Sequence, residues 1–321
     1  MSDNIPLYKG CKELRGKCHI CGNRTRHIED DKFTCLNCCE MKNIDSKFTE
    51  DELKILTEIK KYNLTPGEIK QRLQGVKPEP KKVYDHSVIG KFKIGVIADT
   101  HIGQEKFDEG LFKFAGEMFR KAGVKNVYHA GDILEGASGR DGQCFELTHI
   151  GFENQISYAA NLFTKYFKKL EVYGIEGNHD LWYKQKNNAG VSVGRVLQER
   201  APNFHYLGEM EADITLGPKC IMKLFHANDG TAYANSYKMQ KLVESFEGGH
   251  KPQIAVEGHY HKVLYQFTRG VHCIDGGTIC GQTGWMRGKK IPAHKGFWII
   301  DIETGKKGII SFAPKLYAAY D

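Results

Sequence analysis

The chain has 321 residues, of which 40% are hydrophobic and 26% charged, with a formal net charge of +7. This balance excludes a wholly disordered chain and a collagen-like one, and the length suits two domains. No run of about 18 apolar residues occurs, so we expect no membrane span. The N-terminus lacks the apolar stretch of a secretory signal, so we expect a cytoplasmic protein. The positive charge fits an anionic partner such as DNA and equally an ordinary, slightly basic enzyme.

Six of the ten cysteines lie in the first 39 residues, and four of them form two Cys-X-X-Cys pairs. Each pair on a tight turn presents two thiolates, and four thiolates make a tetrahedral structural Zn²⁺ site. The zinc would supply the folding energy of so small a segment. The spacing therefore predicts a zinc ribbon over residues 1–44, although other nearby Cys and His residues remain alternative ligands. The predicted zinc ligands are Cys18, Cys21, Cys35 and Cys38, and the alternatives are Cys11, His19, His27 and Cys39.

Residues 45–76 carry a helical pattern. Leu53, Leu56 and Ile59 recur at three-residue steps, and Thr49 with Glu52 forms a capping box. A short break separates this helix from a second one, so we predict a helical hairpin, with a helix-turn-helix as the alternative. Residues 77–90 contain two prolines and several lysines without periodicity, and we predict a linker there.

From Lys91 to the end at residue 321, short apolar runs alternate with helical stretches. Helices are predicted over 107–123 and 156–170. Strands are predicted over 91–101, 125–132, 171–180, 220–228, 252–261, 271–277 and 296–303. This alternation indicates an α/β catalytic domain over residues 91–321. The four cysteines of this part are predicted to be reduced core residues: Cys144, Cys220, Cys273 and Cys280.

Polar clusters follow the apolar runs of five of these strands. Ligands of open α/β sheets bind beyond the carboxyl ends of the strands, so we expect these clusters to converge. Their mixture of carboxylate, amide and imidazole groups suits Mn²⁺, Fe²⁺ or Zn²⁺. The residues are Asp99, His101, Asp132, Asn178, His226, His259 and His261.

In chain order these clusters read Asp-X-His, Gly-Asp, Gly-Asn-His-Asp, His and Gly-His-X-His. The set resembles the calcineurin-like metallophosphoesterase superfamily over about residues 92–300. The resemblance implies a four-layer sandwich, in which helices flank two mixed sheets. It also implies two metal ions, with Mn²⁺ favoured. The first ion would be held by Asp99, His101 and His261, and the second by Asn178, His226 and His259, with Asp132 bridging both.

The resemblance further implies that His179 is a catalytic residue beside the scissile phosphate and not a metal ligand. Many members orient this histidine with an aspartate three residues after the bridging one, where this chain has Glu135. Two metals about 3.5–4 Å apart neutralise a phosphodiester and activate a bridging hydroxide. His179 would then stabilise the developing charge or protonate the leaving oxygen. No covalent enzyme intermediate is expected.

Other features bear on the substrate. Residues 131–147, including Gln143, are similar to a stretch of the exonuclease subunit of archaeal D-family DNA polymerases and of phage replication phosphoesterases. Trp285 could stack on a base and Arg287 could contact phosphate, but residues 276–290 equally fit a solvated basic loop. Trp182 could cover the substrate or pack beneath the loop.

These observations favour a DNA nuclease, assisted by its N-terminal modules and by replication or repair proteins. A small-molecule or cyclic-nucleotide phosphodiesterase is one alternative. A replication or repair scaffold with weak catalysis is another. Nuclease-type members of the family are often dimers, although no sequence feature indicates a homodimer interface.

Overall fold

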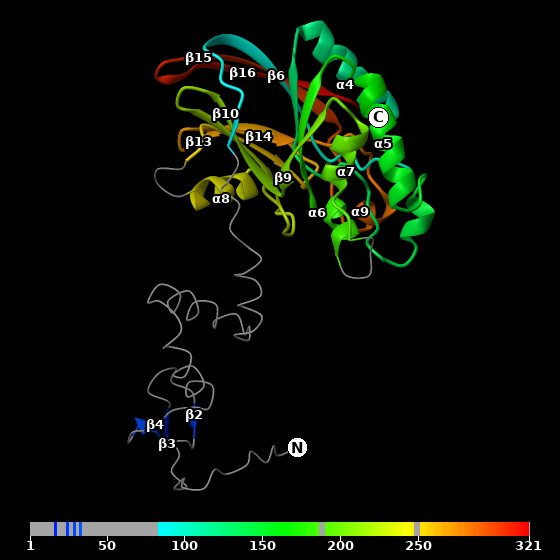
Figure 1. Cartoon of the computed structure of the whole chain (residues 1–321), viewed down its shortest axis with the longest axis vertical. Coiled ribbons are helices and arrows are strands. Elements are labelled where there is room, and N and C mark those ends of the chain that lie inside the picture. The colour runs from blue at the N-terminus through cyan, green and yellow to red at the C-terminus, as the bar shows by residue number, and fades with distance from the viewer. Residues whose placement is uncertain are drawn as a thin grey trace. The chain divides into compact units, whose positions relative to one another are not determined.

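The structure is a computed structural model that describes residues 83–185, 190–246 and 251–320, with the backbone of four short strands nearer the N-terminus (Figure 1). Those strands are β1 (Gly16–Lys17), β2 (Arg24–Thr25), β3 (Ile28–Glu29) and β4 (Lys32–Phe33). β1 pairs with β2 and β3 with β4, both antiparallel. Chain contacts define two units, Met1–Glu79 and Pro80–Asp321. The predicted zinc cysteines, the helical hairpin over 45–76 and residues 77–82 lie outside the described residues.

The second unit contains two six-stranded sheets. The first sheet has the order β16–β15–β6–β7–β8–β9, in which β6 to β9 run parallel while β15 and β16 are antiparallel additions. Its strands are β6 (Gly90–Ile97), β7 (Asn126–His129), β8 (Glu171–Glu176), β9 (Phe204–Glu209), β15 (Gly296–Gly305) and β16 (Gly308–Ala318). The parallel strands direct their carboxyl ends to one edge of the sheet.

The second sheet has the order β13–β14–β12–β11–β10–β5 and is also mixed. Its strands are β5 (Val83–Asp85), β10 (Glu211–Gly217), β11 (Cys220–His226), β12 (Ile254–Gly258), β13 (Val263–Thr268) and β14 (Val271–Gly276). β5 lies inside the segment predicted as a linker, and it pairs in parallel with residues 213–215 of β10. The sheet therefore begins earlier than the local sequence indicates, because this pairing depends on a strand about 130 residues further along.

Helices cover the outer face of each sheet (Figure 1). On the first sheet these are α4 (Glu109–Ala122), α5 (Phe152–Tyr166) and α7 (Val193–Arg200), whose apolar faces bury residues such as Phe119 and Phe163. α4 begins at Asp108, whose Oδ1 accepts the Leu111 N–H at 2.8 Å, and it ends at Gly123 in the left-handed conformation. On the second sheet, α8 (Tyr237–Ser245) buries Met239 and Val243.

A separate apolar core fills the space between the sheets, with Val96 from the first and Val256 and Ile274 from the second. The layers are thus helices, sheet, sheet and helix, which confirms the predicted fold of two mixed sheets flanked by helices. Short helical turns lie in the connections: η1 (Gln143–Glu146), α6 (Asn178–Leu181), η2 (Trp182–Lys184) and α9 (Gly284–Gly288).

Two further sequence predictions can be compared with this fold. Cys220, Cys273 and Cys280 are buried as predicted, but Cys144 is exposed, because it lies in η1 within a surface connection. Across the described residues, no helix combines the length and the apolar character that crossing a lipid bilayer requires.

Candidate metal centre

The chain turns sharply where the strands end, and polar residues occupy the turns. Five of them have a positive φ that side chains other than glycine rarely adopt: Asp99 (50°), His101 (47°), Asp132 (52°), His259 (89°) and His261 (54°). Such a conformation costs of order 1–3 kcal/mol per residue, and it persists only where surrounding contacts enforce it. The turns follow β6, β7 and β12, so they bring these side chains to one edge of the sandwich.

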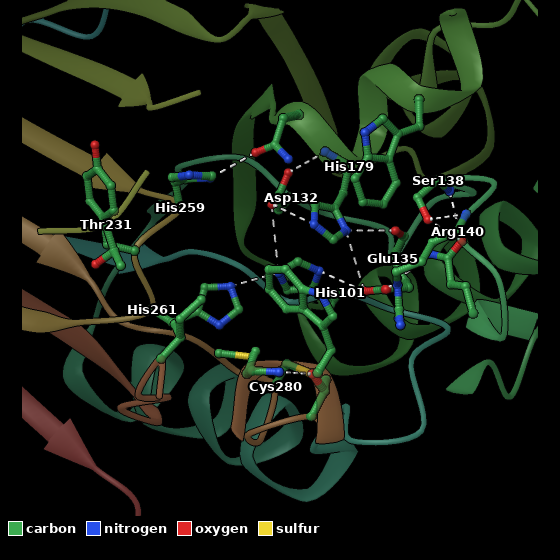
Figure 2. A pocket seen from close by; sticks show the side chains of 18 of the residues that line it. His101, Asp132, Glu135, Ser138, Arg140, His179, Thr231, His259, His261 and Cys280 are labelled. Carbon is green, nitrogen blue, oxygen red and sulfur yellow. Dashed lines mark hydrogen bonds and ion pairs between the residues drawn. The ribbon is translucent and has the colours of Figure 1, made fainter. Parts of the chain in front are cut away.

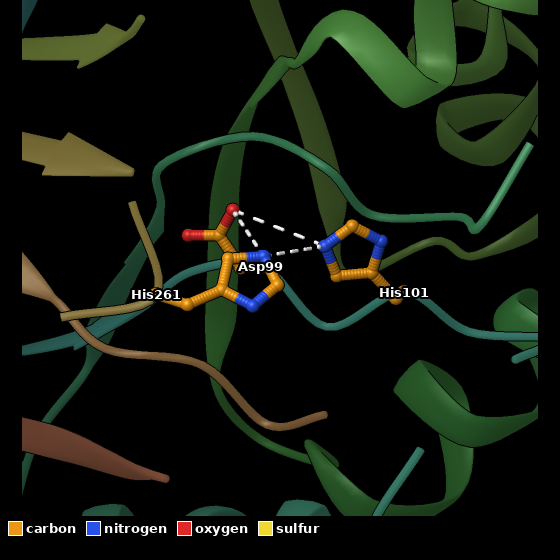
Figure 3. Close-up of side chains that lie close together, drawn as sticks. All are labelled: Asp99, His101 and His261. Carbon is orange, nitrogen blue, oxygen red and sulfur yellow. Dashed lines mark hydrogen bonds and ion pairs between the residues drawn. The ribbon is translucent and has the colours of Figure 1, made fainter. Parts of the chain in front are cut away.

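The first cluster consists of Asp99, His101 and His261 (Figure 3). The Nε2 atoms of the two histidines lie 3.0 Å apart. Asp99 Oδ1 lies 3.5 Å from His261 Nε2 and 4.0 Å from His101 Nε2. All three donor atoms therefore point at one small volume.

The second cluster contains Asp132, Asn178, His226 and His259. His226 Nε2 lies 3.3 Å from Asp132 Oδ2 and 3.1 Å from Asn178 Oδ1, and His259 Nδ1 lies 2.9 Å from that same amide oxygen. The opposite nitrogens of both rings donate to main-chain carbonyls, His226 Nδ1 to Ala130 at 2.7 Å and His259 Nε2 to Asp229 at 2.8 Å. These bonds leave a lone pair on each ring facing the cluster.

Asp132 of the second cluster also faces the first. Its Oδ2 is 3.3 Å from His226 Nε2 in the second cluster and 3.7 Å from His101 Nε2 in the first. Its Oδ1 accepts the His179 N–H at 2.8 Å, which fixes the carboxylate plane. One carboxylate oxygen is thus available to both clusters at once.

The separations between donor atoms match those around a bound cation. Ligands about 2.1 Å from one ion, at right or tetrahedral angles, lie about 3.0–3.4 Å from each other. The separations of 2.9–3.5 Å fall in or near that range, and only the pairs at 3.7 and 4.0 Å are wider. The carboxylate, amide oxygen and imidazole groups, some buried and some partly exposed, therefore fit a divalent cation at each cluster. Donors of these kinds suit Mn²⁺, Fe²⁺ and Zn²⁺.

Glu135 contacts His179 through its main chain and lies near it with its carboxylate. His179 Nδ1 donates to the main-chain carbonyl of Glu135 at 2.8 Å, while the nearest Glu135 carboxylate oxygen is 3.5 Å away. That same oxygen, Oε2, accepts from His101 Nδ1 at 3.0 Å. Glu135 Oε2 therefore lies near both rings, and the main-chain carbonyl of Glu135 makes the shorter contact with His179.

Charges around the clusters shift the pKa of several side chains. Burial alone would lower the pKa of His179, but the carboxylates of Asp132 and Glu135 outweigh it and raise this pKa to about 9. Burial would also lower the pKa of His226, but the carboxylates of Asp132 and Asp99 outweigh it and raise this pKa to about 9. For His259, burial dominates and lowers the pKa to about 4. A cation at either cluster would displace the protons that these carboxylates attract to the ligating histidines.

Asp180 joins two of the turns, a role that the sequence analysis missed. Its carboxylate is buried and accepts the N–H groups of Ile133 (3.0 Å), Leu134 (2.9 Å) and Gly177 (2.9 Å). The turn after β7 is thereby fixed to the turn after β8. Its position as the last residue of Gly-Asn-His-Asp was the available signal.

Gly177→Ala is expected to destabilise the protein by about 1–3 kcal/mol and to weaken cation binding, since overpacking displaces neighbours. An added Cβ would lie 2.2 Å from Asp132 Oδ1 and 2.4 Å from the Asp132 nitrogen. Thermal unfolding and Mn²⁺ titration calorimetry measure the two effects. Gly288→Ala is the control, because nothing lies within 4 Å of its Cβ position. Equal behaviour of the two variants would contradict the tight fit.

A cavity of about 420 Å³ opens beside the clusters (Figure 2). Three of the predicted substrate contacts line it, namely Gln143, Trp182 and Trp285. Arg287 is exposed on α9 and is not among the described residues of the lining, because α9 turns Met286 inward instead. The sequence analysis missed other lining residues, including Arg140, Asp229, Thr231 and Cys280.

The tryptophan Trp182 packs against His179, with ring centroids 3.9 Å apart. Gln143 is buried and uses both ends of its amide within the protein. Its Nε2 donates to Glu135 Oε1 at 3.3 Å, and its Oε1 accepts from Ser138 N and Oγ, both at 2.8 Å. Gln143 therefore supports the cavity wall more than it faces a ligand.

The amino-acid sequence of this chain is similar to those of two archaeal proteins. The chain is 24% identical over 254 residues (66% of this chain) to the DNA polymerase II small subunit of Pyrococcus furiosus. It is 24% identical over 242 residues (61%) to the subunit of that name from Methanothermobacter thermautotrophicus. The matches span 41% and 49% of those relatives, so the chain covers half of their length or less.

A solved structure of a novel archaeal phosphodiesterase aligns with 70% of this chain and with its own full length, at 14% identity and a TM-score of 0.42. Residues 92–305, about two thirds of the chain, match the calcineurin-like phosphoesterase superfamily domain, and the chain therefore belongs to that superfamily.

Proposed function

We propose that this protein is a dinuclear-metal phosphodiesterase that cleaves DNA. The observation that carries the proposal is the pair of donor clusters that share Asp132 Oδ2, 3.3 Å from His226 Nε2 and 3.7 Å from His101 Nε2. Asp99, His101 and His261 would hold one cation, and Asn178, His226 and His259 the other. Mn²⁺ is the proposed metal. Two bound cations would neutralise the phosphodiester and lower the pKa of a water molecule between them.

His179 is proposed as the proton donor to the leaving oxygen. Its Nδ1 is engaged by the Glu135 carbonyl, so Nε2 is the nitrogen that can face the substrate. The carboxylates of Asp132 and Glu135 raise the pKa of His179, which favours the protonated ring. Glu135 acts as a positioning residue in this proposal, because its carbonyl orients His179 and its carboxylate orients His101.

Two observations favour DNA as the substrate. The relatives from Pyrococcus furiosus and Methanothermobacter thermautotrophicus carry the name DNA polymerase II small subunit. Trp182 and Trp285 line the cavity, and Trp285 is 47% exposed, so Trp285 presents a ring on which a base can stack. We further propose that the predicted zinc ribbon and helical hairpin hold the DNA or a replication protein.

A panel of phosphodiesters tests the function. With Mn²⁺, the full chain is expected to cleave end-labelled single- or double-stranded DNA and also bis-p-nitrophenyl phosphate. Cleavage of the small ester and cyclic nucleotides alone would overturn the nuclease proposal and favour the small-molecule phosphodiesterase. Absence of all hydrolysis from protein loaded with Mn²⁺ would favour the scaffold. Changing Cys35 and Cys38 together to serine is expected to weaken DNA cleavage while sparing the small ester.

A further inference from the structure

The connection between β7 and α5 forms one wall of the cavity. Ser138, Arg140, Gln143 and Glu146 all belong to it and all line the cavity. Arg140 is the single Lys or Arg among the lining residues in the described part of the chain. Figure 2 places Arg140 with Ser138 and Glu135 on one side of the cavity, opposite Thr231 and His259.

The backbone of Arg140 is held in place by its neighbours. Its N–H donates to Ser138 Oγ at 3.1 Å, and its carbonyl accepts the Gln143 N–H at 3.1 Å. Gln143 in turn donates to Glu135, whose carboxylate accepts from His101. A continuous series of hydrogen bonds therefore links the Arg140 connection to the first cluster.

The guanidinium of Arg140 has capacity for a further ligand. Its Nη2 donates to Glu146 Oε2 at 2.7 Å, and its side chain is 37% exposed. That bond engages one of about five N–H donors on a guanidinium. The ordinary interpretation is a surface ion pair, which adds little to the stability of the fold. An ion pair alone does not account for a guanidinium that lines a cavity next to the proposed phosphodiester site.

We propose that Arg140 binds a second phosphate of the substrate, the one adjacent in the strand to the phosphate that is cleaved. The inference rests on the proposed function and narrows it. Arginine recognises phosphate with two parallel hydrogen bonds, and the backbone contacts of Arg140 hold it in the same cavity wall as Glu135. The site therefore selects nucleotide chains with consecutive phosphates over diesters that have only one.

Matched dinucleotides test this selection. TpT carries only the phosphate to be cleaved, whereas pTpT and TpTp add a second one at either end. Wild-type protein with Mn²⁺ is expected to have a higher kcat/KM for pTpT or TpTp than for TpT. Arg140→Ala is expected to lower kcat/KM for the preferred substrate roughly 10- to 100-fold, as charged hydrogen bonds are worth that much, and to change TpT less than about twofold. Arg200→Ala is the matched control, because it breaks an Arg–Glu pair between α7 and α5, and neither residue is among the described residues that line the cavity.

Glu146→Gln distinguishes two roles of Arg140, namely binding a phosphate and holding the cavity wall together through its pair with Glu146. It removes the carboxylate that competes for the guanidinium, so it is expected to raise kcat/KM for the doubly phosphorylated substrate. If Glu146→Gln lowers kcat/KM as much as Arg140→Ala, the pair only supports the wall and the proposal is overturned. An equal loss on TpT in Arg140→Ala would overturn it too.

Binding provides a second measurement, independent of catalysis. The affinity for fluorescent pTpTpT is measured with Mn²⁺ in the slowly cleaving His179→Gln protein. It is expected to fall when Arg140→Ala is added, with the slope of log K against log salt reduced by about 0.7 for one lost phosphate contact. Unchanged affinity and slope would overturn the proposal. If the wild type hydrolyses no diester at all, including bis-p-nitrophenyl phosphate, the proposed function fails, and the binding result still decides whether Arg140 holds phosphate.

Discussion

Asp132→Asn is expected to lower hydrolysis of bis-p-nitrophenyl phosphate at least about 10³-fold, since a metal contributes several kcal/mol of charge stabilisation and 1.36 kcal/mol is one factor of ten. The carboxylate oxygen Oδ2 faces both clusters, so its replacement removes a charged donor from each. Asparagine preserves the shape and can still accept the His179 N–H through Oδ1. The loss is therefore expected in metal binding and rate, with the fold retained.

Calorimetric Mn²⁺ titration, metal analysis and circular dichroism accompany the rate measurement for Asp132→Asn. Asp301→Asn is the matched control, because Asp301 is 53% exposed and pairs only with Lys93 among the contacts described, 3.2 Å away on the first sheet. Two tightly bound Mn²⁺ ions and a wild-type rate in Asp132→Asn would contradict the dinuclear proposal. Loss of one ion with full activity would contradict the need for a shared ligand.

His179→Gln is expected to lower kcat about 10²- to 10⁴-fold, the usual contribution of a positioned acid or base. Its Mn²⁺ stoichiometry is expected to stay at the wild-type value. The reason is that His179 Nδ1 is engaged by the Glu135 carbonyl, and Nε2 is 4.0 Å from Asp132 Oδ2. A proton donor matters most when the leaving group is poor, so the loss should be larger for TpT than for bis-p-nitrophenyl phosphate.

The comparison of the two leaving groups tests the assigned role of His179. His179 also lies in a group with His101 and Asp132 whose donor atoms are within 4.8 Å of one another. If His179→Gln loses an ion, His179 is a ligand and the acid assignment is wrong. Equal losses on both substrates would argue against proton donation. His205→Gln is the control, because His205 pairs with Glu171 on the first sheet and is not among the described residues that line the cavity.

The positions of the donor residues could be predicted because each follows a run whose pattern is local. Residues such as Val96 and Ile97 are apolar and buried, and Asp99 marks the point where that run ends. The convergence of several strand ends then follows from the parallel order of β6, β7 and β8. The α/β fold class could be predicted for the same reason, since the alternation of apolar runs and helical stretches is also a local pattern.

Other features depend on contacts between distant segments, which local patterns do not encode. β5 forms only because β10 offers a free edge to residues 83–85. The way in which Glu135 contacts His179 depends on the position of His101, because His101 Nδ1 donates to the Glu135 carboxylate while His179 Nδ1 donates to the Glu135 carbonyl. Arg140 lies within the similar stretch 131–147 but gave no signal of its own, and its place in the cavity wall depends on backbone contacts with Ser138 and Gln143.

Each donor cluster combines side chains from both sheets. Asp99 and His101 follow β6 of the first sheet, while His261 follows β12 of the second. In the other cluster, Asp132 and Asn178 come from the first sheet, and His226 and His259 from the second. A cation at either position would act as a reversible cross-link between the sheets. At a free concentration one hundred times its Kd, each such ion would stabilise the sandwich by about 2.7 kcal/mol. Chelation would therefore destabilise the packing of one sheet on the other and would also remove the ions proposed for catalysis.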